Sequence, residues 1–107
     1  MTFQVIVSDA ADSDLRQIWD YIAANDAAER AFHVLKALEN KIALLVTSPN
    51  VGNVPKELQE LGIGEFRELH WKPYRIVYHI AGRKIWVDGV FDGRRDMKAL
   101  LQQRLMR

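Results

Sequence analysis

The chain has 107 residues, of which 49% are hydrophobic and 27% are charged, a balance typical of a soluble globular protein. Its length predicts one domain, residues 1–107, with a small core. The lack of cysteine excludes disulfides and thiol chemistry, and no apolar run approaches the roughly 18 residues of a membrane span. Because the N-terminal segment also lacks the basic start of a signal peptide, we expect a cytoplasmic protein with no membrane partner.

Charge is distributed unevenly along the chain, although the net charge is only +1. Residues 1–64 carry five basic and nine acidic side chains, whereas residues 65–107 carry ten basic and five acidic ones. A basic half suits a polyanion or an acidic protein partner. A solvated surface with a chance imbalance explains the same counts equally well.

A short strand and two helices are predicted first in chain order. Residues 3–7 (FQVIV) alternate as a strand does, and Ser8 is a suitable N-cap for a following helix. Apolar residues recur at helical spacing over residues 11–22 and again over 27–46. Because few residues separate the two helices, we expect an antiparallel hairpin. The segment 47–55, rich in Pro, Gly and Asn, is predicted to be a loop.

The second half of the chain has the alternating pattern of strands. Residues 65–71, 73–80 and 84–91 are predicted to form three consecutive strands joined by short turns. Asp96 is then suited to cap a short final helix. The element order is β-α-α-β-β-β-α, so we expect an α+β fold in which the helical hairpin packs on a mostly antiparallel sheet.

The turn between the last two strands determines which of their residues share a face. A two-residue turn, Ala81-Gly82 or Gly82-Arg83, is favoured because glycine supplies the positive φ angle that such turns require. Either turn places Arg75 directly or diagonally opposite Asp88, so we predict a structural ion pair between them. The apolar residues are then predicted to share the other face: Tyr74, Ile76, Tyr78, Ile80, Ile85, Val87, Gly89 and Phe91.

Common catalytic and metal-binding motifs are absent from the sequence. It contains no G-x-S-x-G elbow, no Walker loop and no H-E-x-x-H motif. His33, His70 and His79 are far apart and have no carboxylate at metal-ligand spacing. We therefore predict no metal site and no cofactor.

The remaining candidates for chemistry are basic side chains on and after the last strands. Arg67, Arg75, Arg94 and Arg95 are candidates for binding phosphate groups or a target, provided that they share a face or an edge. If the protein is a nuclease, Arg75, His79 and Arg94 are the candidate catalytic residues, with His79 transferring protons. Internal ion pairs with neighbouring aspartates explain the same arginines without a ligand, so no catalytic residue is assigned outright.

Three motifs of the C-terminal half occur together: FRELHWKPYRIVYHI, VDGVFDGRRD and LLQQRL. Their combination closely resembles the C-terminal half of the RelE/ParE toxin superfamily. The segments 8–26 and 48–62 resemble the first helix and the loop of its ParE branch. The resemblance therefore covers nearly the whole chain.

The resemblance implies that the protein is the toxin of a type II toxin–antitoxin module, of the kind once described as plasmid stabilisation. Such a toxin is neutralised by a small antitoxin that wraps around it, and the pair represses its own operon. The implied partners are thus a cognate antitoxin in a hetero-oligomer, and operator DNA only through that antitoxin. ParE-branch members poison DNA gyrase, whereas RelE-branch members cleave mRNA on the ribosome without a metal.

Residue by residue, the motifs favour the ParE branch. RelE-type nucleases resemble this chain at Arg75 and loosely at Arg94. However, they tend to carry lysines where this chain has Phe66 and Glu68, and a tyrosine in the C-terminal segment, where residues 96–107 have none. We therefore expect a gyrase inhibitor that catalyses no reaction. The alternatives are a RelE-like mRNA endoribonuclease and an inactive member that acts only in antitoxin binding and operon regulation.

Overall fold

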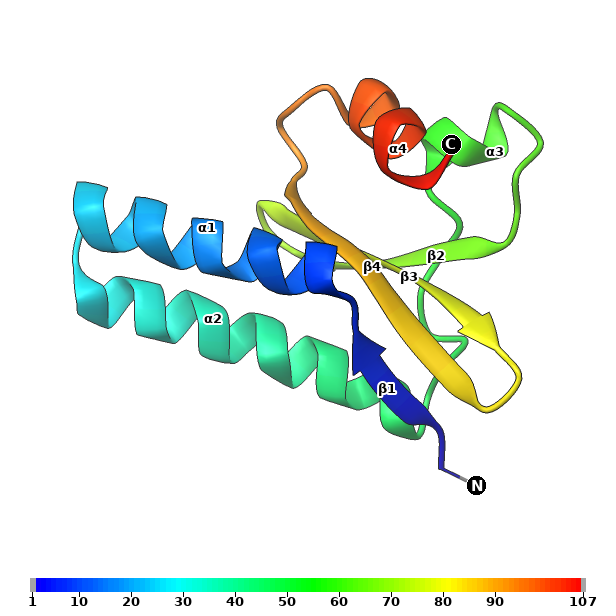
Figure 1. The fold of residues 1–107 in the computed structure, drawn as a ribbon, viewed down its shortest axis with the longest axis horizontal. Coiled ribbons are helices and arrows are strands. Elements are labelled where there is room, and N and C mark those ends of the chain that lie inside the picture. Colours follow the sequence, from blue (N-terminus) through cyan, green and yellow to red (C-terminus); the bar gives the residue numbers. More distant parts are fainter. Residues whose placement is uncertain (1, 107) are drawn as a thin grey trace.

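The computed structural model describes residues 2–106, and its elements follow the predicted order. They are β1 (Gln4–Val7), α1 (Asp9–Asn25), α2 (Ala28–Ala43), η1 (Leu44–Val46), α3 (Lys56–Gln59), β2 (Phe66–Trp71), β3 (Tyr74–Ala81), β4 (Lys84–Asp92) and α4 (Met97–Leu105). Figure 1 shows α1 and α2 side by side as a hairpin, with α3 and α4 next to each other away from it. The predicted α+β fold is confirmed.

Side-chain caps begin two of the helices where the sequence predicts them. The Ser8 hydroxyl accepts a hydrogen bond from the backbone N–H of Ala11 at 3.1 Å, which starts α1. The Asp96 carboxylate accepts one from Ala99 at 3.2 Å, which starts α4. None of the described helices is long and apolar enough to cross a membrane.

The four strands form one sheet in the order β1-β4-β3-β2. The β2–β3 and β3–β4 pairs are antiparallel, and β1 lies parallel to β4 at the sheet edge. The sheet is therefore mostly antiparallel, as predicted. The parallel pair places the start of α1 beside β4, the strand that leads to α4 (Figure 1).

The two faces of the sheet carry separate hydrophobic clusters. The helical hairpin covers one face and forms the main core with it: Ala11, Val34, Leu38, Ile42, Leu45, Leu69, Ile76, Tyr78, Ile85, Val87 and Val90. The short helices α3 and α4 cover the other face and form a smaller core: Leu58, Val77, Phe91, Met97 and Leu101. Polar side chains on this second face therefore lie beside α3 and α4.

A β-bulge corrects the predicted faces at the end of β4. The turn has two residues, Gly82 and Arg83, and the pairing next to it follows the prediction. The register then shifts by one residue, so that Asp88 is left as the extra residue of the bulged strand. As a result Val90 lies in the main core and Phe91 in the smaller one, the reverse of the predicted arrangement.

Candidate functional site

Arg75 is held by two carboxylates on the face that α3 and α4 cover. Its Nε donates to Glu68 Oε1 at 2.6 Å, while Nη1 and Nη2 donate to the two oxygens of Glu57 at 3.0 and 2.7 Å. Arg75 thus connects β3 to β2 and to α3. The predicted ion pair with Asp88 is wrong, because the bulge places Phe91 opposite Arg75.

The Arg75 cluster is largely shielded from solvent. Glu68 is only 3% exposed, and the side chains of Arg75 and Glu57 are each 13% exposed. The hydrogen bond from Arg75 lowers the pKa of Glu57. The pKa of Arg75 is raised in turn, mainly by its hydrogen bond to Glu57 and to a smaller extent by its bond to Glu68. The cluster therefore consists of one cation and at least one firmly ionised carboxylate at neutral pH.

His79 lies on the same strand and the same face as Arg75, but its partner is Asp88. Its Nδ1 lies 2.7 Å from Asp88 Oδ2, and its ring meets the Phe66 ring edge-on. Burial raises the pKa of Asp88, against the lowering effect of the His79 hydrogen bond. Four residues of extended chain separate His79 from Arg75, about 13 Å along a strand. The two nuclease candidates therefore do not contact each other.

Arg67 lies on the face of the helical hairpin, opposite Tyr78 in the sheet. Its Nη1 donates to the carbonyl oxygen of Gly52 at 2.6 Å. The Tyr78 hydroxyl anchors the same loop, donating to the Pro49 carbonyl at 2.7 Å and accepting from the Gly52 N–H at 3.0 Å. Arg67 therefore fastens the loop between α2 and α3, on the other side of the sheet from Arg75.

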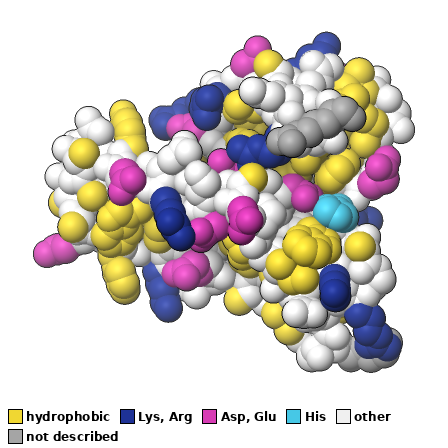
Figure 2. Space-filling model, viewed as in Figure 1, with side chains coloured by type: hydrophobic (Ala, Val, Ile, Leu, Met, Phe, Trp, Pro, Cys, Tyr) yellow, Lys and Arg dark blue, Asp and Glu magenta, His cyan; other side chains and the backbone are white. Residues whose placement is uncertain are grey.

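Arg94 and Arg95 lie at a cleft of about 750 Å³ between α1 and the loop that precedes α4. Arg94 donates two hydrogen bonds to the Asp92 carboxylate, from Nε to Oδ1 at 3.0 Å and from Nη2 to Oδ2 at 2.7 Å. These bonds raise the pKa of Arg94 and lower that of Asp92. Figure 2 shows one group of Lys and Arg side chains over this loop, with others spread across the same face of the molecule. The four candidate arginines therefore do not form one site: Arg67 binds the loop before α3, Arg75 lies on the opposite face of the sheet, and Arg94 and Arg95 line the cleft.

The lining of the cleft combines apolar, aromatic and basic side chains. Its aliphatic residues include Ile18, Ile22, Val34, Val90 and Leu100, and its aromatic residues include Tyr21, Trp71 and Tyr74. Burial raises the pKa of Tyr74. Within residues 2–106, the basic residues Arg30, Lys72 and Arg95 form no ion pair, whereas the acidic Asp14 and Asp92 are both paired. Asp26 is the remaining acidic residue of the lining, so the cleft has a surplus of positive charge.

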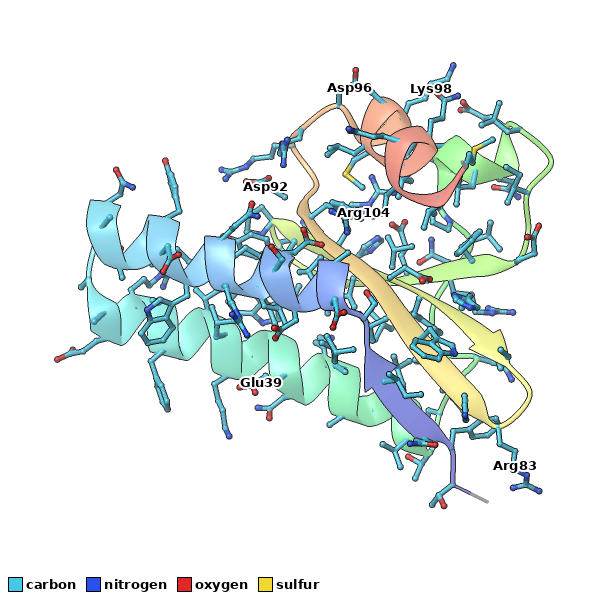
Figure 3. All side chains as sticks on the ribbon, in the orientation of Figure 1. Glu39, Arg83, Asp92, Asp96, Lys98 and Arg104 are labelled. Atoms are coloured by element: carbon cyan, nitrogen blue, oxygen red, sulfur yellow. The ribbon has the colours of Figure 1, made fainter. Side chains whose placement is uncertain are left out.

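Arg104 lines this cleft and joins α4 to α1. Its Nη1 and Nη2 donate to the two oxygens of Asp14 at 2.9 and 3.0 Å, and Nη1 also donates to the carbonyl of Asp88. The guanidinium lies 4.9 Å from the centre of the Phe91 ring. Figure 3 shows Arg104 between the two helices. Sequence reasoning missed this pair because 90 residues separate its members.

The sequence matches the family model described as the ParE toxin of the type II toxin–antitoxin system, parDE, over residues 5–97. The chain belongs to this toxin family. Since the match spans the hairpin, the sheet and the start of α4, the family assignment rests on most of the fold. No curated protein sequence matches the chain significantly.

Solved structures of toxin–antitoxin proteins share the fold of this family member. The chromosomal ParDE system of Pseudomonas aeruginosa has 16% identity and a TM-score of 0.72, covering 85% of this chain and 96% of that one. The RelBE2 toxin–antitoxin complex of Mycobacterium tuberculosis has 18% identity and a TM-score of 0.61, covering 86% and 99%. A mutant of the Escherichia coli toxin RelE in the free state has 13% identity and a TM-score of 0.65, covering 99% and 100%.

Proposed function

We propose that this ParE family toxin acts by inhibiting DNA gyrase and catalyses no reaction itself. The observation that carries the proposal is the state of Arg75, whose three guanidinium nitrogens are all bound by Glu57 and Glu68. A nuclease that used Arg75 would have to present those donors to a phosphate group. The match to the ParE family supports the same branch. Such an activity requires a cytoplasmic protein, since gyrase acts there.

A cognate antitoxin is the second proposed partner, and the cleft beside Arg95 suits one of its segments. The apolar part of the lining fits a bulky aliphatic or aromatic side chain. Arg30, Lys72 and Arg95, which form no ion pair among the described residues, fit carboxylates that flank it. We propose that the antitoxin binds here and that the toxin contacts operator DNA only through it. Charge reversal at Arg95 is expected to weaken the complex, whereas Lys84→Glu at the far end of β4 is a matched control.

A RelE-like endoribonuclease is the alternative function, and one observation favours it. Asp88 orients His79 through Nδ1, an arrangement that leaves the other ring nitrogen to transfer a proton. The His79–Asp88 pair lies apart from both Arg75 and Arg94, however, so the three candidate catalytic residues do not converge on one phosphate position.

A gyrase assay tests the proposal directly. Purified gyrase, ATP and relaxed plasmid are incubated with increasing amounts of the folded protein, and supercoiled and linear DNA are measured. We expect linear DNA to accumulate and to disappear when the antitoxin is added in equal amount. If folded protein leaves gyrase unaffected, gyrase inhibition is wrong. Cleavage of mRNA on programmed ribosomes, lost in His79→Ala, would then establish the nuclease, and no cleavage would indicate the inactive member.

A further inference from the structure

The sheet ends at β1, and the described part of the chain places no strand on its outer side (Figure 1). The backbone N–H groups of Gln4 and Ser8 donate toward β4 and the turn before it, at 2.9 and 3.1 Å. Because backbone groups alternate between the two sides of a strand, those of Val5 and Val7 point outward. Within residues 2–106 these outward N–H groups donate no hydrogen bond. Such an edge is a template for another strand.

The β1 edge has no charge, proline or bulge that would prevent strand pairing. Its sequence is QVIV, and its register against β4 is regular. Only its start is closed, where the Phe3 N–H donates to the Val46 carbonyl of η1 at 2.8 Å. Beyond this point Val7 is 37% exposed, and Leu44 of η1 is 48% exposed. The open part of the edge therefore combines unpaired main-chain groups with apolar surface.

We propose that β1 pairs with β1 of a second copy of this chain, antiparallel, about a two-fold axis at Ile6. In this register Val5 lies opposite Val7 of the other copy, so that each such pair exchanges both of its N–H···O=C hydrogen bonds. The two sheets become one, and each copy contributes the same surface, as in most homodimers. The proposal goes beyond gyrase inhibition and does not rest on it. It also leaves the proposed antitoxin site open, since no residue of β1 lines the cleft.

Opposite charges at the two ends of β1 favour a second copy in this orientation. Asp9 begins α1 directly after the strand, whereas Lys84 lies beside Gln4 at its start. Asp9 and Lys84 are both exposed, and neither forms an ion pair within the described residues. Antiparallel pairing brings the acidic end of each copy next to the basic end of the other, whereas parallel pairing would bring like charges together. The edge is therefore complementary to itself in the antiparallel orientation.

The same register covers apolar side chains near the axis. Ile6 lies beside Trp86 of β4, and both are only partly buried. Directly opposite residues at a non-hydrogen-bonded position have Cα atoms about 4.5 Å apart, so the two Ile6 side chains pack on each other. On the other face of the sheet, Val7 packs beside Val5 of the second copy. Pairing thus removes apolar surface from water on both faces.

Sedimentation velocity of the full chain, freed from antitoxin and measured over a range of concentrations, tests the proposal. We expect a reversible dimer. Val7→Pro removes an outward N–H, and proline is tolerated on an edge strand when its missing donor faces solvent. Its dimer should be weaker by about tenfold or more, because the symmetric pair loses one donor in each copy. Val7→Ala keeps the N–H and is the matched control, with a smaller loss. A protein that stays monomeric, or a folded Val7→Pro that associates as tightly as Val7→Ala, would overturn the proposal.

Cysteine variants test the register independently, and they decide the question if Val7→Pro does not fold. The chain has no cysteine of its own. Ile6→Cys should form a disulfide-linked dimer on oxidation, because the two Cα atoms at the axis lie within disulfide range. Gln4→Cys is the control, since the register separates the two Gln4 positions by about 13 Å along the strands. Equal cross-linking of the two variants would contradict pairing at Ile6.

Two measurements distinguish a second copy from other occupants of the edge. The amides of Val5 and Val7 should gain protection from hydrogen exchange as the toxin concentration rises without antitoxin. Protection that appears only with antitoxin would mean that an antitoxin strand occupies the edge, and the proposal would be wrong. Asp9→Lys makes both ends of the edge basic, so it should weaken the dimer and the loss should shrink in high salt. An unchanged dimer would contradict the antiparallel orientation.

Discussion

Two arginines hold the short helices of this toxin in place, and they do so by different means. Arg75 is bound by Glu57 and Glu68, which precede it by 18 and 7 residues and come from the neighbouring α3 and β2. Arg104 binds Asp14, 90 residues away, and thereby joins α4 to α1. The Arg75 side chain is 13% exposed, whereas that of Arg104 is 26% exposed.

The difference in burial indicates that the Arg75 contacts stabilise the core, whereas the Arg104 contact holds α4 against α1. Arg75 neutralises a carboxylate that the sheet buries, so its loss leaves the Glu68 charge with only the neutral Asn53 donor and the half-exposed His70 beside it. Arg104 lies over Phe91 at the rim of the cleft, where water reaches the pair more easily. We therefore expect loss of Arg75 to affect global unfolding and loss of Arg104 to affect α4 first.

The largest expected effect is that of Arg75→Met. The variant leaves Glu57 and Glu68 together without their cation, and we expect a loss of about 3–5 kcal/mol in the free energy of unfolding. Urea unfolding followed by circular dichroism measures it. Arg94→Met is the matched control: its ion pair is 75% exposed on the arginine side, so the unfolding midpoint should not change. A stable Arg75→Met protein that has lost toxicity would instead indicate a functional role for Arg75.

Gly89→Ala is expected to disturb both the bulge and the Arg104 contact. An added Cβ would lie 2.4 Å from the Phe91 ring and 3.0 Å from Arg104 Nη1, too close for either group to stay in place. Overpacking of this kind costs about 1–3 kcal/mol. Gly64→Ala, where a Cβ meets nothing within 4 Å, is the control. Urea midpoints that are equal for the two alanine variants would contradict the close packing at the bulge.

Arg104→Ala is expected to release α4 while leaving the sheet intact. The bond to Asp14 is bidentate and charge-assisted, and we expect its loss to cost about 1–3 kcal/mol. Hydrogen exchange measures the effect locally: amides of α4 should lose protection, whereas those of β3 should not. A double-mutant cycle with Asp14→Asn isolates the pair, because Asp14 also accepts from the Val90 N–H. Uniform loss of protection across α4 and β3 would mean that both arginines support the core.

The sequence allowed the order of elements, the hairpin and both capped helices to be predicted, because each depends on residues that are close together in the chain. The faces of β4 beyond Asp88 were mispredicted, since an alternating pattern does not reveal where one residue is left over. That single error also produced the wrong partner for Arg75. The contact between Arg75 and Glu68 could be predicted only from the register of β2 against β3. The contact between Arg75 and Glu57 could be predicted only from the position of α3 relative to the sheet. Nothing in the sequence around Arg104 or Asp14 indicates that the two side chains pair, because 90 residues separate them.

The smallest predicted effect concerns how the free energy of unfolding depends on pH, which differs in sign between Glu57 and Asp88. The folded-state pKa of Glu57 is lowered from 4.5 by Arg75, so Glu57 stabilises the fold above about pH 4.5 and this contribution is lost as pH falls through the lowered pKa. Asp88 has the opposite sign: burial raises its pKa above 3.8, so its contribution is present below that value and is lost as pH rises through the raised pKa.

Comparison of the unmodified protein with Glu57→Gln isolates the first of these contributions. At pH 7 the variant should be less stable by about 1 kcal/mol, since a charge-assisted hydrogen bond to Arg75 is replaced by a neutral one. Urea midpoints at pH 7, 5, 4 and 3 should converge as Glu57 is protonated, because both proteins then carry a neutral side chain at this position. A difference that stays constant down to pH 3 would mean that shape, and not charge, holds Glu57 on Arg75.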